Sequence, residues 1–238
     1  MISWGIIGLG AMANRFATAM KEVENAKLIG IASKNVEKLK KFGDQYNINN
    51  NFRFNNYEEI LNCNKINSIY ISTLNNTHAN IVTQAAKANK NILCEKPVTI
   101  NYLEAIKVFE ELEKSNVFFL EAIAYCTHPQ THFVMNKIKE GEIGKVTNIE
   151  STFGFSHRKI DPNSRLFSPS LGGGAILDIG CYPLSFTSLI ANANKEERFL
   201  EPNFSNVSGT VCSTGVEDCA YATLNFKEHS EVIKATLS

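Results

Sequence analysis

The sequence predicts an α/β protein in two parts. Residues 1–121 are expected to form a doubly wound parallel sheet, and residues 122–238 an α+β domain with an open, mainly antiparallel sheet. Three observations support this expectation. Apolar strand-like runs alternate with helical runs through the first half, and a glycine-rich turn joins the first pair. Near the end of the chain, β-rich runs follow one another with short turns.

The composition argues against several classes of partner and location. Lys and Arg together number 24, as do Asp and Glu, so no positive excess predicts a nucleic acid or an anionic membrane as partner. We expect neither a signal peptide in residues 1–8 nor a later run that could span a bilayer. The six cysteines form no CxxC pair, which is typical of reduced thiols, so we expect a cytoplasmic protein.

Strands and helices are expected to alternate in the first part. Apolar runs predict strands at residues 2–9, 27–32, 52–54, 68–73, 92–94 and 117–121. Helical periodicity between them predicts helices at residues 11–21, 36–46, 57–61, 78–89 and 102–114. Asn101 and Glu104 have the form of a capping box for the last helix.

The first strand leads directly into a GxGxxA turn that opens a helix. Its residues are Gly8, Leu9, Gly10, Ala11, Met12 and Ala13. The two glycines allow a tight turn and close approach of a pyrophosphate, and Ala13 permits close packing of helix on strand. The amino end of the helix then offers unpaired N–H groups to the anion. This part is therefore predicted to be a dinucleotide-binding Rossmann domain.

The end of the second strand bears on which dinucleotide binds. An NAD site of this type usually has Asp or Glu here, but this chain has Ser33 and Lys34, with Lys38 a helical turn further on. A hydroxyl and two cations suit a 2′-phosphate, so NADP is favoured over NAD. The alternative is that Ser33 caps the following helix and the lysines form its solvated face.

The fourth and fifth strands are expected to end beside the glycine turn. Thr73 ends the fourth strand and Asn75 follows it, both in reach of pyrophosphate and nicotinamide ribose. His78 either faces the cofactor or makes structural hydrogen bonds. The fifth strand ends in Glu95-Lys96-Pro97, which places a charged pair where open parallel sheets bind ligands.

The second part differs from the first in its order of predicted helices and strands. We expect a helix from Pro129 to about residue 140, a long strand at 145–155, and a loop at 156–170. Three glycines at 172–174 open a helix to about residue 191, and β-rich runs follow at 207–213, 219–226 and 232–237.

His128 and His132 lie four apart, but with no recognisable third ligand we expect no metal. Cys126 and Cys181 are interpreted as small hydrophobes.

These motifs together resemble the glucose-fructose oxidoreductase/inositol dehydrogenase (Gfo/Idh/MocA) family. The resemblance rests on the glycine turn, on Glu95-Lys96-Pro97, and on Gly172-Gly173-Gly174 followed by Asp178 and Tyr182. Leu120-Glu121-Ala122, His128-Pro129-Gln130, Arg165-Leu166-Phe167 and Gly180-Cys181-Tyr182-Pro183 look most like its branch of NADP-dependent D-xylose dehydrogenases and dimeric dihydrodiol dehydrogenases. The match runs from about residue 2 to residue 226.

The resemblance implies an oxidoreductase that acts on a hydroxyl or carbonyl of a sugar, polyol or cyclic diol, without a metal. Tyr182 would exchange the substrate proton, and the Lys96 ammonium would lower the pKa of this phenol, which is ordinarily near 10. Asp178 would orient the substrate or Lys96, and Glu95 and Lys96 would line the nicotinamide end of the cofactor site. A homodimer or higher homo-oligomer is expected by family analogy.

Two departures from the family pattern leave alternatives open. Cys126 stands where the branch often has an arginine, and the chain stops at Ser238, where relatives continue. The chain is therefore expected to be short at its C-terminus. The alternatives to an NADP-dependent oxidoreductase are an NADP-binding protein without turnover, or a family member that uses the nicotinamide without net oxidation.

Overall fold

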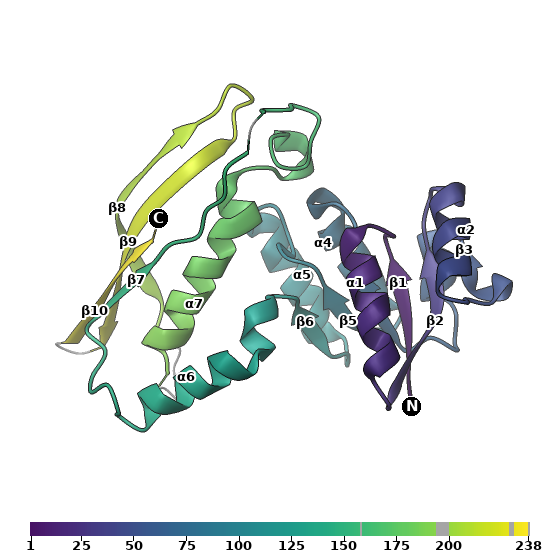
Figure 1. Ribbon diagram of the computed structural model, residues 1–238, viewed down its shortest axis with the longest axis horizontal. Helices are drawn as coiled ribbons and strands as arrows, with labels where there is room; N and C mark the ends of the chain where they lie inside the picture. The colour runs from purple at the N-terminus through teal and green to yellow at the C-terminus, as the bar shows by residue number, and fades with distance from the viewer. Residues whose placement is uncertain (158, 194–199, 229–230, 238) are drawn as a thin grey trace. The chain divides into compact units, whose positions relative to one another are not determined.

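A computed structural model describes residues 1–157, 159–193, 200–228 and 231–237 (Figure 1). The chain divides into two compact units, Met1–Ala122 and Ile123–Ser238. Each unit has its own sheet and its own buried clusters, so each is described by itself.

The first unit is built on a six-stranded parallel sheet with the order β3-β2-β1-β4-β5-β6. Its strands are β1 (Ile2–Ile7), β2 (Ala26–Ala32), β3 (Arg53–Phe54), β4 (Ser68–Ile71), β5 (Asn91–Cys94) and β6 (Phe119–Glu121). The order reverses between β1 and β4, and in a doubly wound sheet this reversal creates the crevice that receives a ligand. The predicted Rossmann arrangement is confirmed.

Helices cover both faces of this sheet. They are α1 (Ala11–Ala19), α2 (Val36–Gln45), α3 (Tyr57–Leu61), α4 (Asn75–Lys87) and α5 (Tyr102–Lys114), with 3-10 turns at Met20–Glu22 and Asn50–Phe52. One buried cluster joins the sheet to α1 and α2, through residues such as Ala13 and Leu39. The other joins it to α3, α4 and α5, through residues such as Ile60, Val82 and Val108.

Helix α4 differs from the sequence prediction at its start. It begins at Asn75 with Leu74 as its N-cap, whereas the apolar periodicity predicted a start at His78. The polar residues after β4 therefore form the first helical turn rather than an open loop. Asn75 and His78 are both buried in this turn, which brings them against the neighbouring strand ends.

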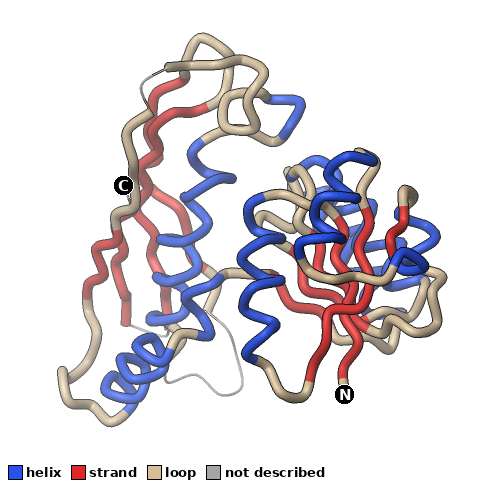
Figure 2. The backbone as a smooth tube through the Cα atoms, turned by 45° about the vertical axis from the view of Figure 1, so that its right-hand side comes forward, coloured by secondary structure: helices blue, strands red, loops and turns tan. Residues whose placement is uncertain are grey.

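The second unit is a four-stranded sheet with two helices. The strands are β7 (Asn148–Ser151), β8 (Pro202–Val211), β9 (Glu217–Glu228) and β10 (Glu231–Leu237), in the order β7-β10-β9-β8. Only the β7–β10 pair is parallel, so the sheet is mainly antiparallel as predicted. The helices are α6 (Pro129–Lys139) and α7 (Cys181–Ala191); short helical turns lie at Ala124–Thr127, Pro169–Leu171 and Ile176–Gly180. Figure 2 shows α7 along one face of the sheet.

The predicted long strand at 145–155 is a four-residue strand, β7. Its partner β10 (Glu231–Leu237) pairs with it only over Lys234–Leu237, and Glu231–Ile233 of β10 are not paired with residues 145–147. Alternating side chains alone do not extend a strand, because each backbone group also needs a hydrogen-bonding neighbour.

One helical stretch among the described residues, Pro169–Ala191, is long and apolar enough by length and composition to cross a membrane. This corrects the expectation that no run of the sequence could do so. Its last part, α7, packs on β7 and β10 and buries Pro183, Thr187 and Ala191, and 28% of the apolar window of the stretch is buried in the structure. A single helix of this kind is weak evidence for a membrane span.

Candidate functional site

The glycine turn after β1 is packed at its first glycine. Gly8 has a φ of +92°, and a Cβ there would lie 2.7 Å from Thr73 Cγ2 and 2.8 Å from the carbonyl carbon of Ser72. The Gly8 N–H donates to the Ala32 carbonyl at 3.1 Å, and the Ser72 hydroxyl donates to the Gly8 carbonyl at 2.8 Å. The turn is therefore bonded to the ends of both neighbouring strands.

The second glycine of the turn lies in open space. A Cβ on Gly10 would meet nothing within 4 Å, and Gly10 is the N-cap of α1 with no side-chain hydrogen bond to the helix. Gly10, Ala11 and Met12 are exposed, whereas Leu9 and Ala13 are buried. A helix amino end without a side-chain cap leaves its first N–H groups available to an anion. The residues present therefore fit a dinucleotide pyrophosphate.

The end of β2 holds the residues predicted to select NADP. Ser33 is buried, and its Oγ accepts from the Asn35 N–H at 3.1 Å. The N-cap of α2 is Asn35, whose side chain accepts from the Lys38 N–H, so Ser33 does not itself cap the helix. The side chains of Lys34 and Lys38 are exposed, and Lys34 Nζ lies 5.3 Å from the centroid of the Tyr57 ring.

His78 is buried and bonded through both ring nitrogens. Nδ1 lies 2.8 Å from the Pro97 carbonyl oxygen and Nε2 lies 3.2 Å from the Thr73 carbonyl oxygen. Burial lowers the pKa of this imidazole, although the two carbonyls and Glu95 act in the opposite direction. Of the two readings of His78, this geometry matches structural hydrogen bonding. The side chain joins the end of β4 to the turn after β5.

The Glu95-Lys96-Pro97 turn is surrounded by partners that the sequence analysis did not identify. The Tyr70 hydroxyl, on β4, donates to Glu95 Oε1. Glu121, at the end of β6, accepts from the Val98 N–H at 2.8 Å. Burial raises the pKa of Glu121, and this effect is opposed by the Val98 bond and by the positive charge of Lys96.

Glu121 could have been found from the sequence. It is the last residue of a parallel strand next to the one that ends at Cys94, so it lies at the same edge of the sheet. The first unit therefore gathers Thr73, Asn75, His78, Glu95 and Lys96 at adjoining strand ends.

In the second unit, Asp178 forms an ion pair that the sequence analysis did not predict. The buried Asp178 carboxylate lies 2.7 Å from Arg165 Nη1. Asp178 belongs to the π-helical turn Ile176–Gly180, and Tyr182 follows in the first turn of α7. π-helical turns inside helices are frequent at functional sites. The structure thus places Asp178 and Tyr182 in one continuous helical segment.

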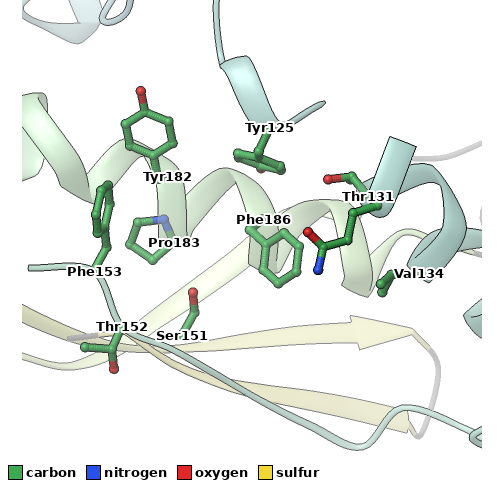
Figure 3. Close-up of a pocket in the computed structure, with 10 residues that line it drawn as sticks. Tyr125, Thr131, Val134, Ser151, Thr152, Phe153, Tyr182, Pro183 and Phe186 are labelled. Carbon is green, nitrogen blue, oxygen red and sulfur yellow. The ribbon is translucent and has the colours of Figure 1, made fainter. Parts of the chain in front are cut away.

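Tyr182 lines a cavity of about 350 Å³ in the second unit (Figure 3). The ring of Phe153 meets that of Tyr182 edge to face, with 5.4 Å between centroids. The Tyr125 ring packs edge to face on Phe186, and its hydroxyl lies 2.8 Å from Ser185 Oγ. Burial raises the pKa of Tyr125. Polar groups at the cavity come from Gln130, Thr131, Ser151 and Thr152.

One histidine of the pair that was considered as a metal site caps a helix instead. His128 is the N-cap of α6, and its Nδ1 accepts from the Gln130 N–H at 3.1 Å. Within the part of the chain that the structure describes, no group of three or more His, Cys, Asp or Glu could hold a metal ion.

Comparison with known proteins defines the class. Residues 2–135 match the Gfo/Idh/MocA oxidoreductase family with an NAD-binding Rossmann fold, and residues 133–236 match the C-terminal domain of the same family. The chain therefore belongs to the Gfo/Idh/MocA family of oxidoreductases, which the sequence motifs predicted.

Particular relatives are dehydrogenases and reductases. The chain is 29% identical over 237 residues to trans-1,2-dihydrobenzene-1,2-diol dehydrogenase of Xenopus tropicalis, covering 98% of this chain and 68% of that one. The human enzyme of the same name is 25% identical, with 94% and 65% covered. The chain thus spans about two thirds of the length of these curated relatives.

Solved structures share the fold. Aldose-aldose oxidoreductase from Caulobacter crescentus, complexed with glycerol, superposes with a TM-score of 0.86 at 24% identity, covering 99% of this chain and 70% of that one. A 3-ketoreductase from Actinomadura kijaniata, in complex with NADP and TDP-benzene, has a TM-score of 0.80 at 22% identity, with 100% and 70% covered.

Proposed function

We propose that the chain is an NADP-dependent oxidoreductase that acts on a hydroxyl or carbonyl carbon of a sugar, polyol or cyclic diol. The observation on which this depends most is the glycine turn, where Gly8 is packed against Thr73 and Gly10 faces open space at an uncapped helix end. NADP, when bound, supplies the hydride acceptor or donor. The names of the relatives support the substrate class, since they include a diol dehydrogenase and an aldose oxidoreductase.

We assign the cofactor's phosphates to two places in the first unit. The N–H groups at the start of α1 bind the pyrophosphate. Ser33, Lys34 and Lys38 bind the 2′-phosphate, and the exposure of both lysines supports this assignment. The carboxylate nearest to Lys34 in the sequence is that of Glu37, in the first turn of α2. Thr73 and Asn75 remain proposed contacts of the nicotinamide ribose.

We assign proton transfer to Tyr182, assisted by Lys96. The position of Tyr182 on a cavity bounded by aromatic rings and a few polar groups supports this role. A positive charge favours a phenolate and so brings a tyrosine into acid–base range. Asp178 is a positioning group in this proposal, because its carboxylate is already paired with Arg165.

The first test is a titration of the 238-residue chain with NADPH and with NADH, followed by the fluorescence of the bound dihydronicotinamide. We expect tight binding of NADPH and weak binding of NADH. Aldoses, polyols and cyclic diols are then screened by the absorbance of NADPH. A folded chain that binds neither nucleotide contradicts the proposal. Formation of product without a change in absorbance indicates instead an enzyme that uses nicotinamide without net oxidation.

The oligomeric state and the cytoplasmic location stay predictions. Sedimentation of the purified chain measures the first, and we expect a dimer or a higher homo-oligomer.

A further inference from the structure

The helical segment that bears Asp178 and Tyr182 receives its N-terminal cap from a distant strand. Its own N-cap, Ala175, provides no side-chain hydrogen bond. The Ile176 N–H donates instead to Glu217 Oε1 at 2.9 Å, across 41 residues of sequence. A carboxylate at the amino end of a helix satisfies a backbone donor and complements the helix dipole.

The glycine before this segment makes room for the Glu217 carboxylate. Gly174 has a φ of +113°, and a Cβ built on it would lie 2.7 Å from Glu217 Cδ and 2.7 Å from Oε2. A side chain at this position would therefore force the Glu217 carboxylate to shift. The last of the three glycines thus permits a close contact with a side chain of the same unit, in addition to the left-handed backbone that it adopts.

The Glu217 side chain is itself presented by the hairpin of β8 and β9. Glu217 is the first residue of β9 and is paired with Val211 of β8. In the turn between these strands, the Cys212 N–H donates to the Val216 carbonyl at 2.9 Å, and Val216 is buried. The capping group is therefore held by the sheet, and the position of the helix start is tied to the sheet through one carboxylate.

The other side of the segment is fixed by the loop that bears Arg165. The Gly174 N–H donates to the Leu166 carbonyl at 2.9 Å, next to Arg165, whose guanidinium pairs with Asp178. The Asp178 N–H in turn donates to the Gly174 carbonyl at 3.0 Å. Gly174 thus lies between two anchors, the Arg165 loop and the Glu217 carboxylate.

We propose that Glu217 is a positioning residue for catalysis: its carboxylate fixes the first turn of the helical segment and thereby the placement of Tyr182 and Asp178. This inference rests on the proposed role of Tyr182. Loss of the carboxylate leaves the Ile176 N–H without this acceptor and releases the segment at one end. A reacting group displaced by about 1 Å can cost about 100-fold in rate.

The test compares three variants of the full chain. Glu217→Ala removes the acceptor, Glu217→Gln keeps an oxygen that can accept from the Ile176 N–H, and Glu201→Ala removes an exposed carboxylate of the same unit as a matched control. For Glu217→Ala we expect kcat to fall about 10- to 100-fold with unchanged NADPH affinity and a shifted pH profile of kcat. Glu217→Gln should recover most of the activity, and Glu201→Ala should match the parent.

The outcomes separate this inference from the proposed function. Parent activity that is lost in Tyr182→Phe but retained in Glu217→Ala overturns the role of Glu217 and leaves the proposed function standing. A chain that binds NADPH but turns over no substrate, or a Tyr182→Phe variant of full activity, overturns both. A Glu217→Ala variant whose folded fraction and activity fall together, with an unshifted pH profile, assigns Glu217 to stability alone and also overturns the inference.

Discussion

Tyr182 is the side chain on which the proposed chemistry depends most directly. Tyr182→Phe removes one hydroxyl and keeps the ring that packs against Phe153. We expect kcat to fall about 100- to 10,000-fold, the usual contribution of a general acid or base, while NADPH affinity stays unchanged. Steady-state kinetics and nucleotide titration measure the two effects. Equal turnover in the Phe variant would end the assignment of Tyr182.

Lys34 allows a test of cofactor choice at an exposed side chain. Its ammonium is exposed over the Tyr57 ring, so Lys34→Ala removes a charge without opening a cavity. We expect NADPH to bind roughly tenfold more weakly, equivalent to about 1.4 kcal/mol, with no change for NADH. Lys40→Ala, on the exposed side of the same helix, is the control. An equal loss for both nucleotides would show that Lys34 does not read the 2′-phosphate.

The buried His78 makes the unfolding free energy of the first unit depend on pH. Burial lowers the pKa of its imidazole below the unfolded value, so the folded chain binds fewer protons there than the unfolded chain does. Its contribution to stability is therefore present above about pH 6.5 and is lost as pH falls through the lower, folded-state pKa. We expect the loss of unfolding free energy on acidification to be smaller in His78→Gln than in the parent.

Urea unfolding at about pH 7.5 and about pH 5 measures this difference. His132→Gln, which changes an exposed histidine of the second unit, is the control. An identical pH dependence in the parent and in His78→Gln would contradict the assignment.

The two glycines of the turn allow stability and nucleotide binding to be tested separately. Gly8→Ala places a methyl group 2.7 Å from Thr73 Cγ2 at a left-handed backbone position, so we expect a loss of about 1–3 kcal/mol of stability. Gly10 has a φ of −95° and open space around it, so Gly10→Ala should lose less stability than Gly8→Ala, although Ala is the less favourable N-cap residue. Its methyl group occupies the approach of the pyrophosphate, and we expect at least about tenfold weaker NADPH binding.

Thermal unfolding and nucleotide titration of both variants check this pair. If Gly10→Ala keeps full affinity for NADPH, the pyrophosphate does not approach the turn at that point.

The sequence predicted elements well where local signals agree. α3 and α5 have the predicted bounds, and Asn101 caps α5 by accepting from the Glu104 N–H. The predicted elements are wrong where pairing with residues distant in sequence determines the structure. β7 is short because it pairs only with Lys234–Leu237 of β10, and no local pattern reports where such pairing begins. The π-helical turn before α7 was missed because a π turn has no distinct apolar period in sequence.

The candidate site residues were proposed from motifs, but motifs did not indicate their partners. Arg165 meets Asp178, and Glu217 meets the start of the helix that bears Tyr182; each pair is joined only by the fold. Glu121 lies near Lys96 because it comes from the next strand in the sheet, and this neighbour alone could have been inferred from the order of the strands. Spacing along the chain indicates which chemistry is present, whereas the electrostatic environment of each group depends on residues far away in sequence.

The whole molecule is organised as two units with separate cores. The clusters around Ile69 and Ile31 lie entirely in the first unit, and those around Leu224 and Met135 lie entirely in the second. The proposed nucleotide contacts at Gly10, Lys34 and Thr73 all belong to the first unit, and the cavity at Tyr182 belongs to the second. Binding of the nucleotide and placement of the proton-transfer group are therefore assigned to different units.

This division predicts that residues 1–122 fold and bind NADPH by themselves. The six-stranded sheet is complete within these residues, with helices on both faces, so no strand of its core is lost by truncation. We expect cooperative thermal unfolding and an NADPH affinity within about threefold of that of the full chain, since a threefold change is only about 0.65 kcal/mol. Turnover should be absent, because Tyr182 is removed. Calorimetry and fluorescence titration of the two chains provide the measurement. A fragment that folds but binds NADPH far more weakly than the full chain would mean that the second unit contributes directly to the nucleotide site.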